Sequence, residues 1–431
     1  MRAFVVVTLL VSWILLLETV GAGCAEPPAG GLPKLPPPVL EEFTIARNGN
    51  LITVPVATLG KTLQFLVDTG FSTSCFNARY RAALGERLRV VRVATPTGEV
   101  FFDRYRSKVM TLGRLELRQD FETSCVDLSD AEHVTGRRVD GILGMDALQD
   151  LVVNIDFDAG KLRILAYADE GAGHAIPLRW HEKRHFHEGP FALVKIGNES
   201  PREFLVDTGA IAHNAGSLDG DAFDEMSRKG VISVLRGVYG AGSLGEPIQT
   251  RVARAPRVSI GGFTHRDMLF ERLPSERSIS LSFLARYLVT LDFPKSTMYL
   301  RPGKAFNRLD RRQLTTIELE RVADEIRVRK GRVAHPGELG ELRHGDAILS
   351  VDGADARSMS IYDVEEFLSL PGAHKLMVKD SGGVRQVTLV LLPRPEEIAS
   401  PKTPPARDKI PQWLGADKRG AAKRDRSKFD D

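Results

Sequence analysis

Short apolar runs separated by glycine-rich breaks dominate residues 41–310 of the chain. These runs are rich in β-branched and aliphatic side chains, as in LITVPV at residues 51–56, TLQFLV at 62–67 and LVVNIDF at 151–157. Runs of this length, bounded by turn-forming residues, predict strands rather than helices. We therefore expect this part of the chain to form a mainly β architecture of the barrel or sandwich type.

The same region contains an internal repeat. The segment FLVDTG occurs twice, and it places Asp68 and Asp207 139 positions apart (207 − 68). Further along, VVNIDF at residues 152–157 recurs as LVTLDF at residues 288–293, at an offset of 136 (288 − 152). Two blocks that recur at nearly the same offset predict two copies of one β-rich unit in a single chain.

The chain on either side of this repeat has a different composition. Its first residues combine Arg2, an apolar run and several small residues, which is the pattern of an export signal. The next stretch is rich in proline and glycine, and the last stretch mixes proline with both charges. We predict a signal peptide at residues 1–25, a linker at 26–40, a first lobe at 41–170, a second lobe at 171–310, a third domain at 315–395 and a disordered tail at 396–431.

The predicted signal places the mature protein outside the cytoplasm, where it is periplasmic, anchored to the envelope or secreted. Gly-Ala-Gly before Cys24 resembles a lipoprotein box, so lipidation, cleavage and an uncleaved membrane tether all stay open. Export permits a disulfide between Cys75 and Cys125, although two buried thiols fit the sequence equally well.

Composition narrows the function without identifying it. Apolar residues make up 42% and charged residues 27% of the chain, as in an ordinary soluble protein, and the net charge of +3 gives no reason to expect nucleic acid as a partner. The sequence has no CxxC pair, Cys/His cluster or P-loop, so we expect no metal and no cofactor. HEKRHFH at residues 181–187 lacks the spacing of a zinc site and predicts a solvated connection.

Each FLVDTG segment ends an apolar strand in a carboxylate at a tight turn. Glycine permits close approach of the backbone, and the threonine hydroxyl can hold the loop in place. Two such loops related by a pseudo-twofold axis bring Asp68 and Asp207 together, where like charges cannot both ionise and one proton is shared. Such a pair can activate water and protonate a carbonyl oxygen, which is general acid–base hydrolysis of an amide. The supporting loop residues are Thr69, Gly70, Thr208 and Gly209.

These paired motifs resemble those of the aspartic peptidases, specifically the retropepsin-like branch. DGILGMDAL at residues 140–148 is similar to the family's apolar pair ending in glycine, which packs under the Asp-Thr-Gly loop. The resemblance implies two tandem pepsin- or retropepsin-like β-barrel lobes that form a bilobal aspartic protease. It also implies an aspartic-type endopeptidase that acts as a monomer on polypeptide, with Asp68 and Asp207 as catalytic residues. The flap candidates are Thr97 and Gly98 in the first repeat and Tyr239 and Gly240 in the second.

Two positions depart from the family pattern. Phe71 follows the first Asp-Thr-Gly where a small residue is usual, and Ser280 replaces the glycine of the second apolar block. An alternative function therefore stays open, in which the chain is a catalytically inactive pseudo-protease that binds peptides or acts as a scaffold outside the cytoplasm.

The third domain has a different pattern from the lobes. LRHGDAILSVDG at residues 342–353 predicts a strand between two turns, residues 360–370 have helical spacing, and residues 384–391 predict a closing strand. The first of these segments resembles the PDZ domains of exported bacterial proteases. The resemblance implies a small PDZ-like α+β domain that binds a C-terminal peptide as an added strand, and so recruits or regulates substrate. A degenerate module that only packs on the lobes is the alternative.

Overall fold

The computed structural model describes residues 37–46, 51–118, 120–183, 186–211, 214–235, 239–241, 248–310, 317–329 and 341–391. The predicted signal peptide, most of the predicted linker and the predicted tail lie outside the described residues. No helix within the described ranges is long and apolar enough to cross a membrane.

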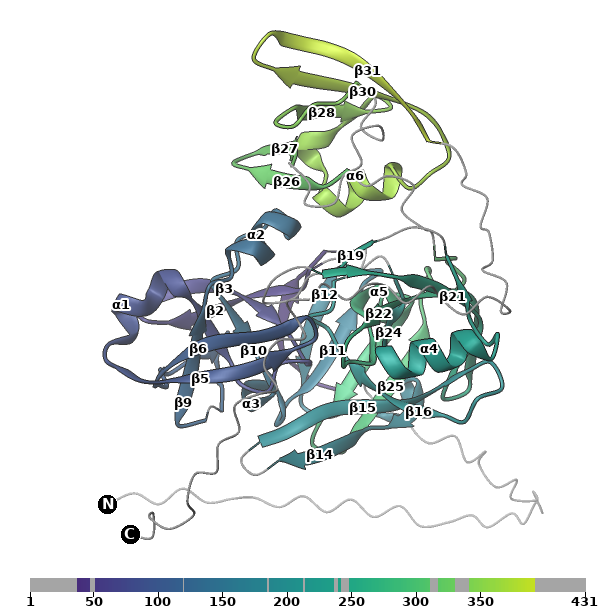
Figure 1. Ribbon diagram of the computed structural model, residues 1–431. Helices are drawn as coiled ribbons and strands as arrows, with labels where there is room; N and C mark the ends of the chain where they lie inside the picture. Colours follow the sequence, from purple (N-terminus) through teal and green to yellow (C-terminus); the bar gives the residue numbers. More distant parts are fainter. Residues whose placement is uncertain are drawn as a thin grey trace, which may run out of the picture. The chain divides into compact units, whose positions relative to one another are not determined.

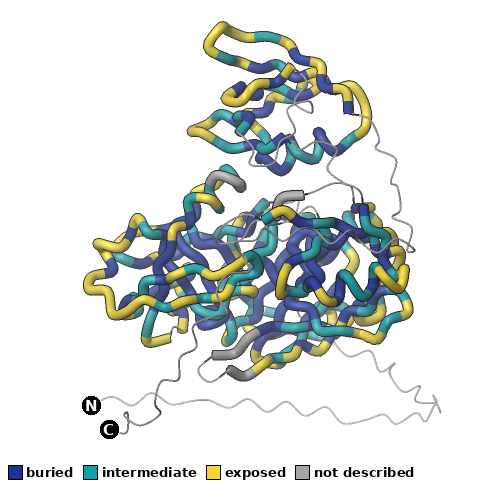
Figure 2. The backbone as a smooth tube through the Cα atoms, viewed as in Figure 1, coloured by how far each residue is buried: buried dark blue, intermediate teal, exposed yellow. Residues whose placement is uncertain are grey.

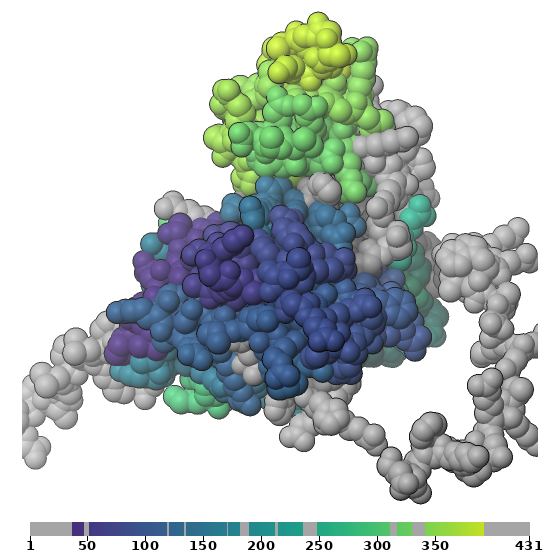
Figure 3. Space-filling view, turned by 90° about the vertical axis from the view of Figure 1, so that its left-hand side faces the viewer, coloured from purple at the N-terminus to yellow at the C-terminus, as the bar shows by residue number. Residues whose placement is uncertain are grey.

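Lobe 1 is built on a nine-stranded sheet with the strand order β5-β6-β9-β4-β10-β3-β2-β7-β8 (Figure 1). In the space-filling view of Figure 3, this lobe presents a continuous purple-to-blue surface. Its strands are β2 (Thr53–Thr58), β3 (Lys61–Val67), β4 (Cys75–Asn77), β5 (Arg87–Thr95), β6 (Gly98–Arg106), β7 (Thr111–Leu112), β8 (Leu115–Glu116), β9 (Glu122–Val126) and β10 (Gly141–Leu143). Its short helices are η1 (Ala78–Tyr80), α1 (Arg81–Leu84), α2 (Ser129–Thr135) and α3 (Met145–Leu148).

Lobe 2 is built on an eight-stranded sheet with the order β14-β15-β16-β23-β17-β22-β21-β18, and an extra pairing of β15 with β21 closes it. Its strands are β14 (Arg179–Lys183), β15 (Phe186–Ile196), β16 (Arg202–Val206), β17 (Gly216–Asp219), β18 (Ser233–Val234), β21 (Val252–Ile260), β22 (Phe263–Leu273) and β23 (Ser278–Ile279), and its helices are α4 (Gly220–Arg228) and α5 (Leu281–Leu284). A separate hairpin joins β19 (Tyr239–Ala241) to β20 (Ile248–Thr250).

The two lobes repeat one topology. The order β6-β9-β4-β10-β3-β2 in lobe 1 corresponds strand by strand to β21-β22-β17-β23-β16-β15 in lobe 2. The parallel pairs also correspond, because β3 with β10 and β4 with β9 are matched by β16 with β23 and β17 with β22. The predicted fold class, a mainly β chain of two tandem lobes, is therefore confirmed.

A six-stranded sheet of order β1-β12-β11-β24-β25-β13 joins the lobes. Its strands are β1 (Val39–Thr44), β11 (Val152–Asp156), β12 (Lys161–Leu165), β13 (His174–Pro177), β24 (Tyr287–Asp292) and β25 (Thr297–Pro302), and η2 (Glu170–Ala172) precedes β13. The repeated blocks pair antiparallel here, with Val152 opposite Asp292, Asn154 opposite Thr290 and Asp156 opposite Leu288. This register is symmetric about the Asn154–Thr290 pair, whose side chains are hydrogen-bonded at 2.9 Å, so the pseudo-twofold axis passes there.

One hydrophobic core runs through both lobes and the joining sheet, and Figure 2 shows the buried backbone that follows it. Cys125 belongs to this core, whereas Cys75 belongs to a smaller apolar cluster of lobe 1. Cys75 is opposite Ser124 in the β4–β9 pair, which puts Cys75 and Cys125 on different faces of the sheet. Both thiols are free and buried, and so the question that the sequence left open is settled against a disulfide in this structure.

The third domain has a six-stranded sheet and a hydrophobic core of its own. Its elements are β26 (Leu319–Val322), β27 (Glu325–Val328), β28 (Ala347–Val351), β29 (Ala354–Asp355), η3 (Ala356–Ser358), α6 (Ile361–Phe367), β30 (Gly372–Asp380) and β31 (Gly383–Leu391). Helix α6 begins at a capping box, in which Ser360 and Asp363 each bond the other's backbone N–H. These elements make a small α+β domain, and its PDZ character stays a prediction.

Candidate active site

The two Asp-Thr-Gly loops leave equivalent strands. Asp68 directly follows β3, and Asp207 directly follows β16. The backbone N–H of Asp68 donates to the carbonyl of Leu143 at 3.1 Å, and that of Asp207 donates to the carbonyl of Ile279 at 3.1 Å. The apolar block of each repeat therefore holds its own aspartate loop from the neighbouring strand.

The threonines of the two loops are hydrogen-bonded across the axis between lobes. The backbone N–H of Thr69 donates to Thr208 Oγ1 at 3.1 Å, and the N–H of Thr208 donates to Thr69 Oγ1 at 3.0 Å. Each hydroxyl in turn donates across the axis to a carbonyl, from Thr69 to Val206 and from Thr208 to Val67. Both threonines are buried, so these four bonds lock the two loops together away from water.

The crossed loops bring the two carboxyl groups into contact, and they are hydrogen-bonded to one another. Gly70 passes so close to Asp207 that a Cβ at Gly70 would lie 2.7 Å from Asp207 Cγ. Gly209 passes closer still to Asp68. Each glycine is therefore required at its position because any side chain would displace the carboxyl group of the other lobe.

The two aspartates have unequal surroundings. Asp207 Oδ1 accepts the backbone N–H groups of Gly209 and Ala210 at 2.8 and 3.0 Å, whereas Asp68 Oδ1 accepts only that of Gly70, at 2.9 Å. Burial raises the pKa of Asp68 well above its usual range, and the charge of Asp207 raises it further. Burial also raises the pKa of Asp207, but its backbone bonds and the bond from Asp68 oppose that effect. The shared proton accordingly belongs on Asp68.

The two departures from the family pattern have local explanations. The Phe71 ring stacks on Phe102 at 5.8 Å and packs against the smaller apolar cluster of lobe 1, so it points into that cluster. In lobe 1, a Cβ at Gly144 would lie 2.6 Å from the carbonyl oxygen of Phe71. In lobe 2, Ser280 at the matching position donates its hydroxyl to the carbonyl of Asn214 at 2.5 Å and caps α5.

The flap candidates lie on hairpins. In lobe 1, β5 and β6 pair from Arg87 to Thr95, and Thr97 and Gly98 stand at the turn that joins them. Gly98 has a φ of +153°, in the region that favours glycine. In lobe 2, Tyr239 and Gly240 lie on β19, which pairs with β20, but their side chains and the hairpin tip at residues 242–247 lie outside the described residues.

The histidine-rich segment at residues 181–187 is only partly described. His181 is exposed, and its Nε2 lies 2.8 Å from a carboxyl oxygen of Glu203. The side chains of residues 182–187 lie outside the described set. Across the described part of the chain, no group of three or more His, Cys, Asp or Glu side chains is arranged to hold a metal ion.

Sequence reasoning missed two acidic residues near the aspartate pair, Glu271 and Glu276. Both are half-buried, and the charge of Glu276 acts on Asp68. Burial raises the pKa of Glu276 to about 8, with a further contribution from Asp207, and burial raises the pKa of Glu271 to about 7. The repeat offset of 136 was the available signal, because it aligns Glu276 with Asp140 of the first repeat (276 − 136).

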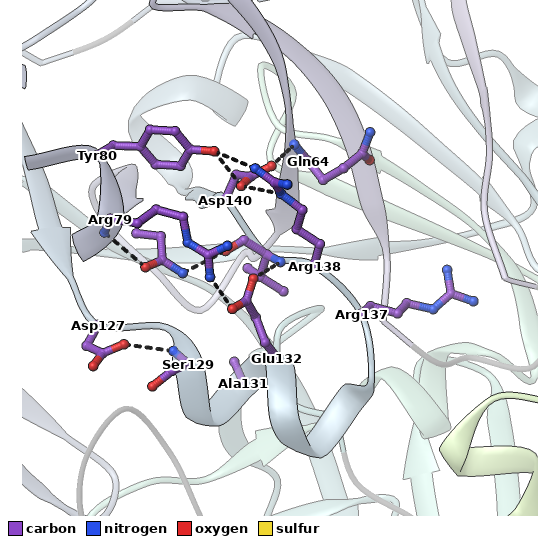
Figure 4. Close-up of polar contacts among 12 residues, drawn as sticks. Gln64, Arg79, Tyr80, Asp127, Ser129, Ala131, Glu132, Arg137, Arg138 and Asp140 are labelled. Carbon is purple, nitrogen blue, oxygen red and sulfur yellow. Dashed lines mark hydrogen bonds and ion pairs between the residues drawn. The ribbon is translucent and has the colours of Figure 1, made fainter. Parts of the chain in front are cut away.

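Asp140 itself is fully paired. Its carboxyl oxygens accept from Tyr80 Oη at 2.6 Å, from Arg138 Nε at 2.8 Å and from the backbone N–H of Gln64 at 2.9 Å (Figure 4). Burial alone would raise the pKa of Asp140, but the bonds from Tyr80, Gln64 and Arg138 outweigh it and lower the pKa. At equivalent positions, lobe 1 thus has an acid paired with Arg138, whereas lobe 2 has an acid that no described cation contacts.

Comparison with known proteins found a family match and a similar solved structure. Residues 54–147, which include Asp68 and residues 140–147 of the DGILGMDAL block, match the model of a family described as aspartyl protease. The chain is also similar to the aspartic proteinase from Irpex lacteus, with 15% identity and a TM-score of 0.40, over 63% of this chain and 99% of that one. No curated protein matches the sequence. The family match supports a peptidase of the aspartic type.

Proposed function

We propose that the chain is an aspartic endopeptidase, which hydrolyses peptide bonds of polypeptides with a water activated between Asp68 and Asp207. The observation that carries this proposal is the crossing of the two Asp-Thr-Gly loops. It brings two carboxyl groups into hydrogen-bond contact in one chain, with Thr69 and Thr208 locked across the axis. A carboxyl pair that holds one proton supplies a base and an acid at the same place.

The unequal surroundings of the pair assign the two roles. Ionised Asp207 takes a proton from the water as its oxygen attacks the scissile carbonyl carbon, while Asp68 donates its proton to the carbonyl oxygen. The tetrahedral diol then collapses as Asp207 gives its proton to the amide nitrogen and the C–N bond breaks. Asp68 recovers a proton from a diol hydroxyl in the same step. Both aspartates thus return to their starting states.

The proposal takes a single exported chain as the working unit, periplasmic, envelope-anchored or secreted. The internal repeat supports a monomer, because each lobe contributes one aspartate to the same site. In the same proposal the third domain is PDZ-like and binds a C-terminal peptide, which recruits or regulates substrate. Its separate hydrophobic core and its sheet with an adjoining helix support this part.

Substitution of the pair tests the proposal. Asp68→Asn and Asp207→Asn should each lower the rate of cleavage of an unfolded protein by a factor of about 10² to 10⁴ or more, because each removes one half of the acid–base pair. Asp156→Asn is the matched control, since Asp156 lies in the other repeated block and accepts a turn N–H from Ala159. Circular dichroism should show that all three variants are folded.

The alternative peptide-binding function predicts a different result. A folded wild-type protein that cleaves no substrate from acid to neutral pH and does not bind pepstatin would overturn the peptidase proposal. Cleavage that survives both Asp→Asn substitutions would overturn it as well, because the hydrolysis would then come from another site.

A further inference from the structure

Each lobe presents one row of side chains on the sheet face next to its aspartate loop. Residues that are paired in register across neighbouring strands point to the same face. In lobe 1 the row, starting two residues before Asp68, is Leu66, Ile142, Cys75, Ser124 and Arg104. In lobe 2 the matching row, starting two residues before Asp207, is Leu205, Ser278, Ser217, Glu271 and Val252.

The lobe 1 row is largely apolar and sealed. Leu66, Ile142 and Cys75 belong to the smaller apolar cluster, together with Phe102 from the flap strand β6. Other flap side chains, including Val93, pack against the same cluster, so this face of the sheet lies beneath the flap hairpin. The sheet face beside Asp68 is therefore backed by hydrocarbon.

The lobe 2 row is polar at the same positions. Ser278 and Ser217 replace Ile142 and Cys75, and their hydroxyls are hydrogen-bonded at 2.9 Å. Glu271 stands beside them in the row. Glu276 approaches the same serines, because Ser217 Oγ donates to its backbone carbonyl at 3.2 Å and Ser278 bonds its carboxyl group.

Among the residues that the structure describes, no cation is paired with these two carboxyl groups. The neighbouring arginines have other partners, since Arg277 pairs with Asp219 at 3.1 Å and Arg272 pairs with Asp224 at 3.0 Å. Within the described ranges, Glu271 forms no ion pair or hydrogen bond, and its side chain is half-buried. A carboxyl group that is partly withdrawn from water and has no counter-ion is costly to ionise, and a cation placed beside it lowers that cost.

Resting on the proposed function, we propose that Glu271 and Glu276 make the lobe 2 wall of the cleft a subsite for a basic side chain, lysine or arginine, of the polypeptide substrate. The chain would then select an apolar residue on the lobe 1 side of the scissile bond and a basic residue on the lobe 2 side. The pseudo-twofold axis supports this division, because it passes between the aspartates and gives each lobe one side of the bond.

The preference for a basic side chain at this subsite should increase with pH. In the free protein both glutamates are protonated in mildly acid solution, because burial raises the pKa of Glu271 to about 7 and that of Glu276 to about 8. A lysine that binds there releases a proton. Preference for lysine over an uncharged residue should therefore grow as pH rises through this range and fade below it.

Matched peptides test the proposal. Each peptide has one bond that the wild type cleaves, with either lysine or methionine at one of the two flanking positions. We expect lysine to raise kcat/KM roughly tenfold over methionine at one flanking position near pH 8, the scale of a hydrogen bond between charged groups. Glu271→Gln combined with Glu276→Gln should bring that ratio close to one, whereas Asp267→Asn, an exposed acid on the same strand β22, should leave it unchanged.

A ratio of one or below at both positions in the wild type would overturn the proposal, as would a ratio that the double variant keeps. Binding gives a second measurement that needs no turnover. Calorimetry with the Asp68→Asn variant should show tighter binding of the lysine peptide, and the two glutamate substitutions should abolish the difference. Cleavage without lysine preference would refute only this subsite, whereas lysine-selective binding without any cleavage by the wild type would refute only the peptidase function.

Discussion

The two lobes have the same geometry at the pseudo-twofold axis, but the residues beside the aspartate pair differ in polarity between them. At the axis, the threonine of each lobe is hydrogen-bonded to the threonine of the other lobe. In each lobe a glycine also lies against the aspartate carboxyl group of the other lobe. On the sheet face beside the aspartates, lobe 1 has an apolar cluster, whereas lobe 2 has two serines. At the equivalent positions 140 and 276, Asp140 is paired with Arg138, whereas Glu276 is bonded to Ser278 and contacts no described cation. Both repeats thus have the same arrangement of residues at the axis, whereas the side chains next to it are apolar in lobe 1 and polar in lobe 2.

The largest effect should come from the glycines of the two loops. Gly209→Ala and Gly70→Ala each place a methyl group against the carboxyl group of the other lobe, so each should lower the cleavage rate by a factor of about 10² or more. Gly262→Ala is the control, because its Cβ would be 3.3 Å from the nearest atom, on the His174 ring. Rates within a few-fold of wild type for either loop variant would show that the crossing does not set the activity.

The crossed threonines should contribute equally to stability. Thr69→Val and Thr208→Val each leave a buried N–H and a buried carbonyl without a partner, so each should lower the free energy of unfolding by about 2–4 kcal/mol. Urea denaturation measures this, with exposed Thr62→Val as the control. Thr→Ser at either position should restore most of the loss. A large effect in one lobe only would break the proposed equivalence at the axis.

The acids at the equivalent positions 140 and 276 should have opposite effects on stability. Asp140 has a lowered pKa, so it stabilises the fold above its unfolded pKa, and Asp140→Asn should cost about 1–3 kcal/mol at neutral pH. Glu276 has a raised pKa of about 8, so its ionisation destabilises the fold as pH rises. Glu276→Gln should therefore leave stability unchanged near pH 4 and raise it above pH 8. Thermal unfolding at both pH values decides this, and a loss of stability on Glu276→Gln at high pH would contradict it.

The smallest effect concerns the pH–rate profile. The charge of Glu276 raises the pKa of Asp68, and Asp68 must keep its proton for the proposed mechanism. Removing that charge by Glu276→Gln should move the alkaline limit of kcat/KM to lower pH and leave the acid limit, set by Asp207, in place. An unchanged alkaline limit would show that Glu276 does not act on the pair.

The internal repeat in the sequence was enough to predict the two-lobed fold. Two FLVDTG segments and two blocks offset by 136 positions predict the pseudo-twofold arrangement, since each local segment has the pattern of its own strand and turn. The catalytic role of Asp68 and Asp207 stays a prediction. The third domain's strand and helix followed from periodicity, although α6 is shorter than the predicted helix at residues 360–370.

Other features depend on contacts that no local pattern encodes. Glu271 meets Ser217 only through the parallel register of β17 with β22, and Ser280 fits only because the Asn214 carbonyl lies within reach of its hydroxyl. The same applies to Cys75 and Cys125, whose opposite faces follow from the register of β4 with β9. Long-range register decides each of these cases, and a single sequence contains no periodic signal for it.

Complementation tests the central claim that one chain forms one complete site. Cleavage of an unfolded protein is measured for the wild type, for Asp68→Asn, for Asp207→Asn and for an equimolar mixture of the two variants. We predict that the wild type cleaves and that both variants and their mixture do not, because each molecule lacks one of its two aspartates. Activity restored in the mixture would show that the aspartates meet between chains, and activity in either variant alone would show that the pair is not the catalyst.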